Sequence, residues 1–143
     1  MSTITLDIVS AEASIFHGDV RFIAITGAMG ELGIHPGHAP LLTVLKPGQI
    51  HATLKDGTAE VFYMSGGMLE VQPTMISILA DAAVRADDLD EAAVKAAKAK
   101  AEKIIQQKQD GMEYSKALSE LAETAAQLRA ISLLRDKLKH SGH

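Results

Sequence analysis

The sequence GELGIHPGHAPLLT, residues 30–43, decides the organisation of the first half of this chain. Its three glycines and two prolines exclude a helix interior, because glycine permits positive φ whereas proline fixes φ and removes a backbone hydrogen-bond donor. The pair Pro36-Gly37 is typical of a tight turn. Beyond Pro40 we expect a buried strand that three apolar side chains enter, namely Leu41, Leu42 and Val44.

Composition divides the 143-residue chain near Arg85. All four prolines and nine of the eleven glycines precede this point, whereas eleven alanines fall between Ala92 and Ala130. Proline and glycine favour turns, and alanine has the highest helix propensity. We therefore expect two domains of different architecture, residues 1–85 and residues 86–143.

The first domain has the pattern of an antiparallel β-sandwich. Apolar and polar residues alternate in short segments, as in strands with one buried face. The inward residues of the first two segments are predicted to be Ile4, Leu6, Ile8, Val20, Phe22 and Ala24. The pair Asp56-Gly57 predicts a tight hairpin, because such turns need positive φ. Many short strands at near-regular spacing indicate a sandwich or flattened barrel.

The second domain reads as an antiparallel α-helical hairpin. We expect a first helix over residues 88–108, with Asp88 and Glu91 at capping-box spacing, and a second over residues 113–138. Residues 109–111 form the short connection between them. The predicted apolar stripe of the second helix is Tyr114, Leu118, Leu121, Ala125, Leu128 and Ile131. The predicted facing residues of the first helix are Leu89, Ala93, Ala96, Ala97 and Ile104.

No catalytic or metal-binding arrangement is evident. His35 and His38 have a spacing that metal sites use, but the chain has no cysteine and no evident third ligand. The run Ser65–Gly67 lacks the glycine-serine-glycine pattern of a nucleophile elbow. A net charge of −4 argues against nucleic acid as a partner. No apolar run approaches the ~20 residues that a membrane-spanning helix needs.

Several of these segments together resemble the epsilon subunit of the bacterial F-type ATP synthase. Besides residues 30–43, the matching motifs are Asp7–Glu12 (DIVSAE) and Ser65–Val71 (SGGMLEV). The resemblance continues through Leu79–Asp81 into a helical tail with Gln127–Arg129, so it covers nearly the whole chain. Three motifs in the right order and spacing make the resemblance specific.

The resemblance implies a non-catalytic rotor subunit of the central stalk, which couples proton-driven rotation of the membrane ring to ATP synthesis. The implied partners are the gamma subunit, the c-ring, and the alpha and beta subunits of the catalytic head. The subunit would lie on the cytoplasmic face of the bacterial inner membrane, held there only through partners. Carried over by position, Glu31 faces the ring, whereas Ser10 and His38 lie on the gamma-facing side.

Some members of that family bind ATP between the helices through an Ile/Leu-Asp-x-x-Arg-Ala motif. This chain has Leu89 and Asp90, but Ala93 stands where the motif arginine would be. At the other arginine positions only Lys100 is basic. Several cations are needed to hold phosphates. We therefore expect no cofactor, and weak ATP binding at most.

The end of the second helix carries four basic residues with only Asp136 opposing them. Bases near a helix C-terminus also serve the helix dipole. The resemblance, however, implies a switch in which an extended C-terminal helix reaches the catalytic head and inhibits ATP hydrolysis. The residues implied in that contact are Arg129, Leu133, Leu134, Arg135, Lys137, Leu138 and Lys139.

Two other functions fit the same composition. One is a ligand-binding β-sandwich with a helical lid, although the chain has few of the aromatic residues that usually line such pockets. The other is a static structural adaptor without a switch.

Overall fold

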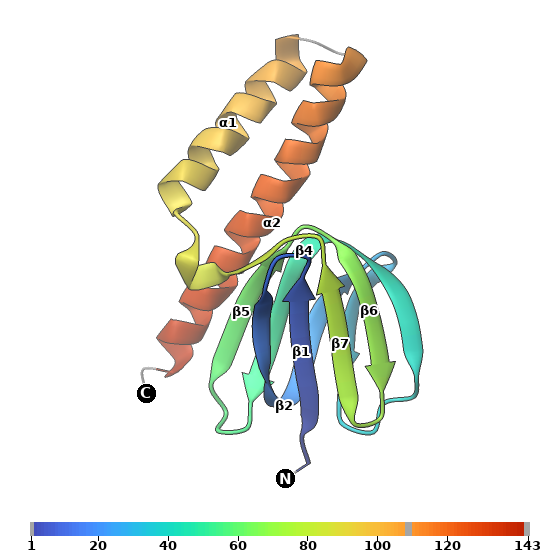
Figure 1. The fold of residues 1–143 in the computed structure, drawn as a ribbon. Coiled ribbons are helices and arrows are strands. Elements are labelled where there is room, and N and C mark those ends of the chain that lie inside the picture. The colour runs from blue at the N-terminus through green and yellow to red at the C-terminus, as the bar shows by residue number, and fades with distance from the viewer. Residues whose placement is uncertain (1, 108–109, 142–143) are drawn as a thin grey trace.

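The computed structural model describes residues 2–107 and 110–141, with side chains described as far as Asp136. A β-sandwich is followed by a two-helix hairpin (Figure 1), which confirms the predicted fold class. The elements are β1 (Ile4–Ser10), β2 (Ser14–Gly27), β3 (Gly30–Ile34), β4 (Leu41–Leu54), β5 (Ala59–Met64), β6 (Gly67–Gln72), β7 (Met75–Ala80), β8 (Ala83–Arg85), the 3-10 helix η1 (Ala86–Asp88), α1 (Glu91–Gln107) and α2 (Gly111–Ser141).

The eight strands form one sheet that closes on itself. Their order is β3-β2-β1-β7-β6-β4-β5-β8, and a further pairing joins β2 to β4. Both of these strands have 14 residues, so each is long enough to contribute to both layers of the sandwich. The pairing of β1 with β7 is parallel, in an otherwise antiparallel arrangement.

A β-bulge in β2 changes which of its side chains enter the core. The register against β4 shifts between Val20 and Phe22. Because a bulge adds one residue to a strand, the alternation of inward and outward side chains is displaced beyond it. Ile23 and Ile25 are therefore fully buried. The prediction that Phe22 and Ala24 point inward was wrong for this reason, since both are only half-buried.

The strand beyond Pro40 forms as predicted, but two of the apolar side chains expected in the core lie outside it. Leu45 is buried within β4 and Leu41 packs partly against the core. Leu42 and Val44 alternate with these residues, so they point to the opposite face. Their side chains are exposed, and the expectation that they enter the core was wrong.

The helical hairpin begins later than predicted. Asp88 belongs to η1, and α1 starts at Glu91. The capping residue is Asp90, whose carboxylate accepts a hydrogen bond from the Ala93 backbone N–H at 3.2 Å. The second helix begins at Gly111, where φ is +90°, and continues to Ser141.

The seam between the helices differs from the predicted one. The buried residues of α1 are Val94 and Ala101, which lie seven positions apart on one helix face. Ala93, Ala96 and Ala97, expected to face α2, are exposed. Alanine occupies six of the 17 positions of α1, on both its buried and its exposed face, so periodicity alone did not distinguish the two faces. On α2, Ile131 is buried as predicted, but Leu118 is exposed.

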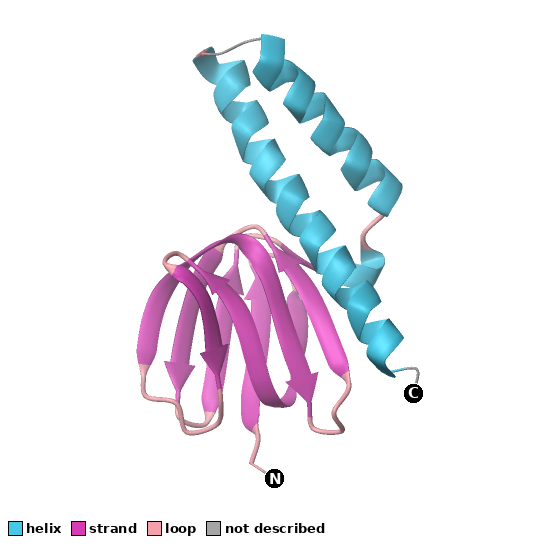
Figure 2. Cartoon of the chain, turned by 180° about the vertical axis from the view of Figure 1, so that it is seen from behind, coloured by secondary structure: helices cyan, strands magenta, loops and turns pink. Residues whose placement is uncertain are grey.

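Helix α2 joins the hairpin to the sandwich. Its C-terminal half contacts β4, β5 and η1, while α1 packs along α2. Figure 2 shows α2 beside the edge of the sandwich, with α1 on its far side. The apolar cluster at this junction is small, and its buried members are Val61, Tyr63, Ala86, Ala126 and Ala130.

The connection between the domains is fixed at Arg85, the last residue of β8. Its guanidinium donates a hydrogen bond to the Glu60 carboxylate at 2.6 Å. It also lies over the rings of Phe16 and Phe62, 5.9 and 5.3 Å from their centroids. Cation–π contacts and a charge-assisted hydrogen bond therefore hold the end of the sandwich in place.

Candidate functional site

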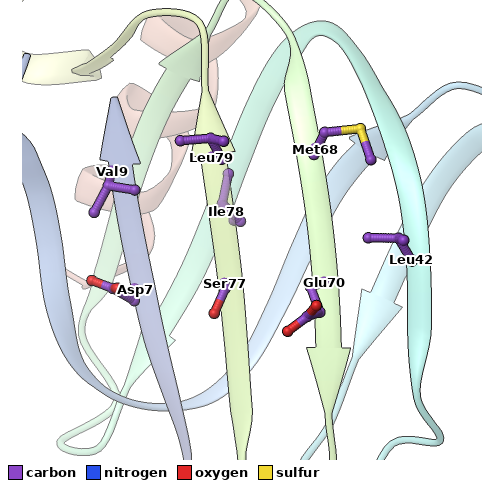
Figure 3. A pocket seen from close by; sticks show the side chains of 8 residues that line it. All are labelled: Asp7, Val9, Leu42, Met68, Glu70, Ser77, Ile78 and Leu79. Carbon is purple, nitrogen blue, oxygen red and sulfur yellow. The ribbon is translucent and has the colours of Figure 1, made fainter. Parts of the chain in front are cut away.

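One face of the sandwich presents two adjoining rows of side chains across β1, β7, β6 and β4. In the strand register the first row is Val9, Leu79, Met68 and Val44. The second row, two positions along each strand, is Asp7, Ser77, Glu70 and Leu42. We call these eight residues the open face. Figure 3 shows most of them from close by, and Figure 1 shows that neither helix crosses in front of β1, β7 and β6.

The open face is strongly apolar for a surface. The side chains of Leu42, Val44 and Leu79 are 66%, 56% and 56% exposed, and Met68 is 38% exposed. Single exposed apolar residues are ordinary, but a contiguous patch rimmed by polar groups marks an interaction site. A shallow hollow lies within it. The helices contribute no described residue to its lining, so they do not form a lid over it.

The polar row adds negative charge to this face. Asp7 and Glu70 flank Ser77 in neighbouring strands. Asp7 also lies 3.5 Å from the imidazole of His17 on β2. Among the side chains that the structure describes, in residues 2–107 and 110–136, no group of three is arranged to bind a metal ion. The arrangement is suited to binding an apolar surface that carries basic groups.

Glu31 lies at an exposed hairpin, although it does not occupy the turn itself. It belongs to β3 and pairs with Thr26 of β2. The turn is formed by Ala28 and Met29, and the Met29 side chain is fully exposed. The short tip therefore presents one apolar and one acidic side chain to solvent.

Ser10 and His38 are not brought together. Ser10 is the last residue of β1, and its hydroxyl accepts hydrogen bonds from the backbone N–H groups of Glu12 and Ala13. His38 follows the Pro36-Gly37 turn, where its Nδ1 lies 2.7 Å from the Ala39 carbonyl oxygen. That turn contacts the connection from β6 to β7, at the opposite end of β7 from Ala80, the register partner of Ser10. The open face extends between these two ends.

The residues of the degenerate ATP motif are also separated. Leu89 packs against the junction cluster, and Asp90 caps α1. Lys100 lies about 15 Å farther along that helix, given a rise of ~1.5 Å per residue. There it lines a crevice with Lys116 and two acidic residues of α2, Glu113 and Glu120.

The predicted inhibitory tail is partly engaged with the rest of the chain. Leu133 and Leu134 pack against the junction cluster. Arg135 donates a hydrogen bond to the Glu91 carboxylate, whereas Arg129 is exposed. The side chains of Lys137, Leu138 and Lys139 lie outside the described part of the structure.

The open face was not predicted as a unit, although the sequence contains a signal for it. Strands that are apolar on both faces carry consecutive apolar residues instead of a strict alternation. Such pairs occur at Leu41-Leu42, Met68-Leu69 and Ile78-Leu79. In each pair one residue enters the core and the other contributes to the open face.

Comparison with known proteins gives consistent matches over both domains. The family model for the ATP synthase delta/epsilon chain β-sandwich domain matches residues 3–86, and that for its long α-helix domain matches residues 87–132. The ATP synthase epsilon chain of Legionella pneumophila (strain Corby) is 57% identical over 137 residues, covering 96% of this chain and 98% of the relative. That of Stenotrophomonas maltophilia (strain K279a) is 51% identical over 140 residues, covering 98% and 100%.

Solved structures support the fold. A chain of the Euglena gracilis mitochondrial ATP synthase matches with a TM-score of 0.84 at 22% identity, over 92% of this chain and 82% of that one. A chain of the Tetrahymena thermophila enzyme, in a structure of its central stalk and c-ring, matches with a TM-score of 0.57 at 17% identity. The match covers 91% of this chain and 97% of that one. No helix in the described part of this chain is long and apolar enough to cross a membrane.

Proposed function

We propose a function from the premise that this chain belongs to the ATP synthase delta/epsilon chain family, whose two domain models together match residues 3–132. The chain acts as the epsilon subunit in the central stalk of a bacterial ATP synthase. There it connects the rotating membrane ring to the shaft that drives ATP synthesis in the catalytic head. The chain performs no catalysis itself, and it associates with the cytoplasmic face of the inner membrane through its partners.

The gamma subunit docks on the open face. The observation that carries this assignment is the contiguous exposure of Leu42, Val44 and Leu79 on strands whose other faces form the core. Covering these side chains removes apolar area from water, which contributes roughly 25 cal/mol per Å². Asp7 and Glu70 favour basic groups on the partner. Ser10 and His38 lie at the two ends of this contact.

The c-ring contacts a different place, the exposed tip of the β2–β3 hairpin. Met29 is fully exposed there, and Glu31 is an exposed residue at the start of β3. Two separate contact sites on one closed sandwich allow torque to pass between ring and shaft. A sheet whose strands are hydrogen-bonded all round is suited to this, because it has few unpaired edges along which to open.

The helical hairpin is a switch that inhibits ATP hydrolysis when it is extended. It meets the sandwich through a small, alanine-rich cluster on one helix, so its release exposes little apolar area. In the extended form the tail residues contact the alpha and beta subunits. Arg129 is exposed in the docked form and is available for such a contact without any rearrangement of its surroundings.

Copurification of epsilon with the gamma subunit tests the docking assignment. The double substitution Leu42→Glu and Leu79→Glu places charge in the apolar row and should abolish the complex. The matched control is Met112→Glu, at an exposed position of α2. The assignment is wrong if the double variant, with an unchanged circular dichroism spectrum, still copurifies with gamma in normal yield.

Hydrolysis by assembled ATP synthase tests the switch. Removing residues 134–143 should raise ATP hydrolysis while subunit content and proton coupling stay normal. Unchanged hydrolysis by such complexes would leave the rotor function and remove the inhibitory one.

We propose that the isolated chain needs no cofactor and binds ATP weakly or not at all. Lys100 is distant from Leu89 and Asp90, and it shares its crevice with acidic groups. Calorimetry that gives a micromolar dissociation constant would overturn this.

A further inference from the structure

Beneath α2, two polar side chains each have a buried oxygen atom that lacks a hydrogen-bond partner in the described part of the chain. Gln49 of β4 and Tyr63 of β5 are paired across the strands, and each is 4% exposed. Neither the Gln49 carboxamide oxygen nor the Tyr63 hydroxyl has a partner among the residues that the structure describes. The backbone N–H of Gln49 donates to the Thr26 hydroxyl at 3.3 Å.

Helix α2 covers this part of the sheet but does not satisfy these groups. Tyr63 belongs to the cluster formed with Ala126 and Ala130 of α2, which offer only methyl groups. The polar residue of α2 that is buried within the described chain is Thr124, and its hydroxyl donates to the Glu120 carbonyl of its own helix at 2.8 Å. Burial and the negative charge of Glu123 also raise the pKa of Tyr63 to about 12.

In the docked state, the burial of the alanine methyl groups favours docking, whereas the burial of the two unpaired oxygen atoms opposes it. Alanine methyl groups gain little from burial, because the apolar area that they remove from water is small. A buried donor or acceptor without a partner loses its hydrogen bonds to water and gains nothing in return. When α2 leaves the sheet, water solvates both groups again.

We infer that the Gln49 carboxamide and the Tyr63 hydroxyl weaken the docking of α2 and thereby determine how often the hairpin leaves the sandwich. One consequence of the inference rests on the proposed function: these two residues would set the fraction of subunits able to inhibit ATP hydrolysis. The docking equilibrium itself is a property of the isolated chain.

Thiol labelling of the full chain measures that equilibrium directly, because the chain has no cysteine of its own. Ala130 is fully buried in the junction, so a cysteine in Ala130→Cys reacts with an aromatic disulfide reagent only when α2 is released. Ala52→Cys, buried in the sandwich core, reports global unfolding in the same way. Ala126→Cys is a second junction reporter in case the first disturbs docking.

Tyr63→Phe and Gln49→Met remove the polar groups and keep similar shapes. Each should slow the labelling of the junction cysteine about tenfold, the effect of relieving one unsatisfied group. The matched controls are Tyr114→Phe and Gln72→Met, both outside the junction cluster, and they should leave the rate unchanged.

Two results would overturn the inference. One is a junction cysteine that reacts no faster than Ala52→Cys, because the hairpin would then leave only on global unfolding. The other is unchanged or faster labelling in both Tyr63→Phe and Gln49→Met.

Hydrolysis by assembled complexes separates this inference from the proposed switch. If both hold, the two variants raise hydrolysis by favouring the docked form. Slower labelling with unchanged hydrolysis supports the inference and contradicts the switch. If labelling is unchanged in both variants but tail truncation raises hydrolysis, the switch is supported and the inference is contradicted.

Discussion

Glu91, in the first turn of α1, accepts a hydrogen bond from Arg135 of α2, 44 positions later in the chain. The same carboxylate pairs with Lys95 at 3.1 Å. One acidic side chain therefore joins the start of the hairpin to a residue near its end. Because Arg135 also belongs to the proposed inhibitory tail, replacing it with glutamate affects both states. The new glutamate would repel Glu91 in the docked form. In the extended form, the tail would lack one of the basic groups proposed to contact the catalytic head.

The Glu91 pairing predicts a pH dependence of docking. Hydrogen bonds from Lys95 and Arg135 lower the pKa of Glu91 from its ordinary value of 4.5. Lys95 lies on α1 with Glu91, so only the Arg135 contact differs between the docked and the released form. The stabilisation from that contact is present above 4.5 and is lost as pH falls through the lowered pKa. Below that pH, labelling of Ala130→Cys should increase about two- to fivefold, the range for an exposed ion pair.

Glu91→Gln should show the faster labelling at all pH values and lose the pH dependence. The control is Glu102→Gln, at an exposed position of α1. An unaltered pH profile in Glu91→Gln would show that this pair does not hold the hairpin.

The pKa of Tyr63 predicts a second, alkaline transition. Burial, together with the charge of Glu123, raises this pKa from 10.0 to about 12. A raised pKa means that docking weakens as pH rises from 10 through about 12, because the phenolate loses its solvation beneath α2. This penalty adds to the one that the neutral hydroxyl already imposes on docking.

Ultraviolet absorbance measures this transition in Tyr114→Phe, which leaves Tyr63 as the sole tyrosine. The ionisation midpoint should lie near 12, and Glu123→Gln should lower it. A midpoint at 10 would show that the hydroxyl is solvated, and therefore that α2 does not cover it in solution.

Gly67 should be intolerant of any side chain. Its φ is +148°, and a Cβ atom would lie 2.1 Å from the Leu79 carbonyl oxygen. Relief requires β6 and β7 to separate, so Gly67→Ala should lower the free energy of unfolding by about 3 kcal/mol or more. Gly37→Ala isolates the backbone effect, because φ there is +83° with no atom close to the added carbon.

Gly37→Ala should lower the free energy of unfolding by about 1–2 kcal/mol. Denaturant titration followed by circular dichroism compares the two variants. Equal losses would mean that strands β6 and β7 adjust without cost.

A fragment of residues 1–86 should fold without the helices. The main core cluster consists entirely of residues from the strands. Ending the fragment at Ala86 retains the pairing of β8 with β5 and the contact between Arg85 and Glu60. We expect a cooperative thermal transition and binding to the gamma subunit. An unfolded fragment would show that the sandwich depends on α2, which covers Val61 and Tyr63.

Local sequence features predicted the turns and the two-domain organisation. Gly37 and Gly57 both have positive φ, as the Pro-Gly and Asp-Gly pairs indicated. Positive φ at these glycines could be predicted because it depends on backbone sterics, which act within a few residues. The helix limits were less accurate, because three of the four residues before α1 are aspartates that offer competing caps, and Asp90 is the one that caps the helix.

The sequence did not predict which side chains of β2 face the core. Phe22 and Ile23 are both apolar, and either alternation is consistent with the sequence. The bulge that selects Ile23 exists because β2 must turn from β1 toward β4 while it remains paired with each. A pairing between distant strands thus decided which residues form the core.

The sequence by itself determined the elements of this protein, their order and its membership of a family, because turn chemistry, periodicity and motif order are local properties. The tertiary structure alone decided which apolar side chains remain uncovered and which polar ones become buried. Leu42 and Gln49 show the difference, since they lie on the same strand and both face away from the core. Leu42 is exposed because nothing in the described chain covers its part of the sheet. Gln49 is buried because α2, about 75 residues later, packs over it. Burial depends on which distant surfaces meet, and no local pattern of residues encodes that.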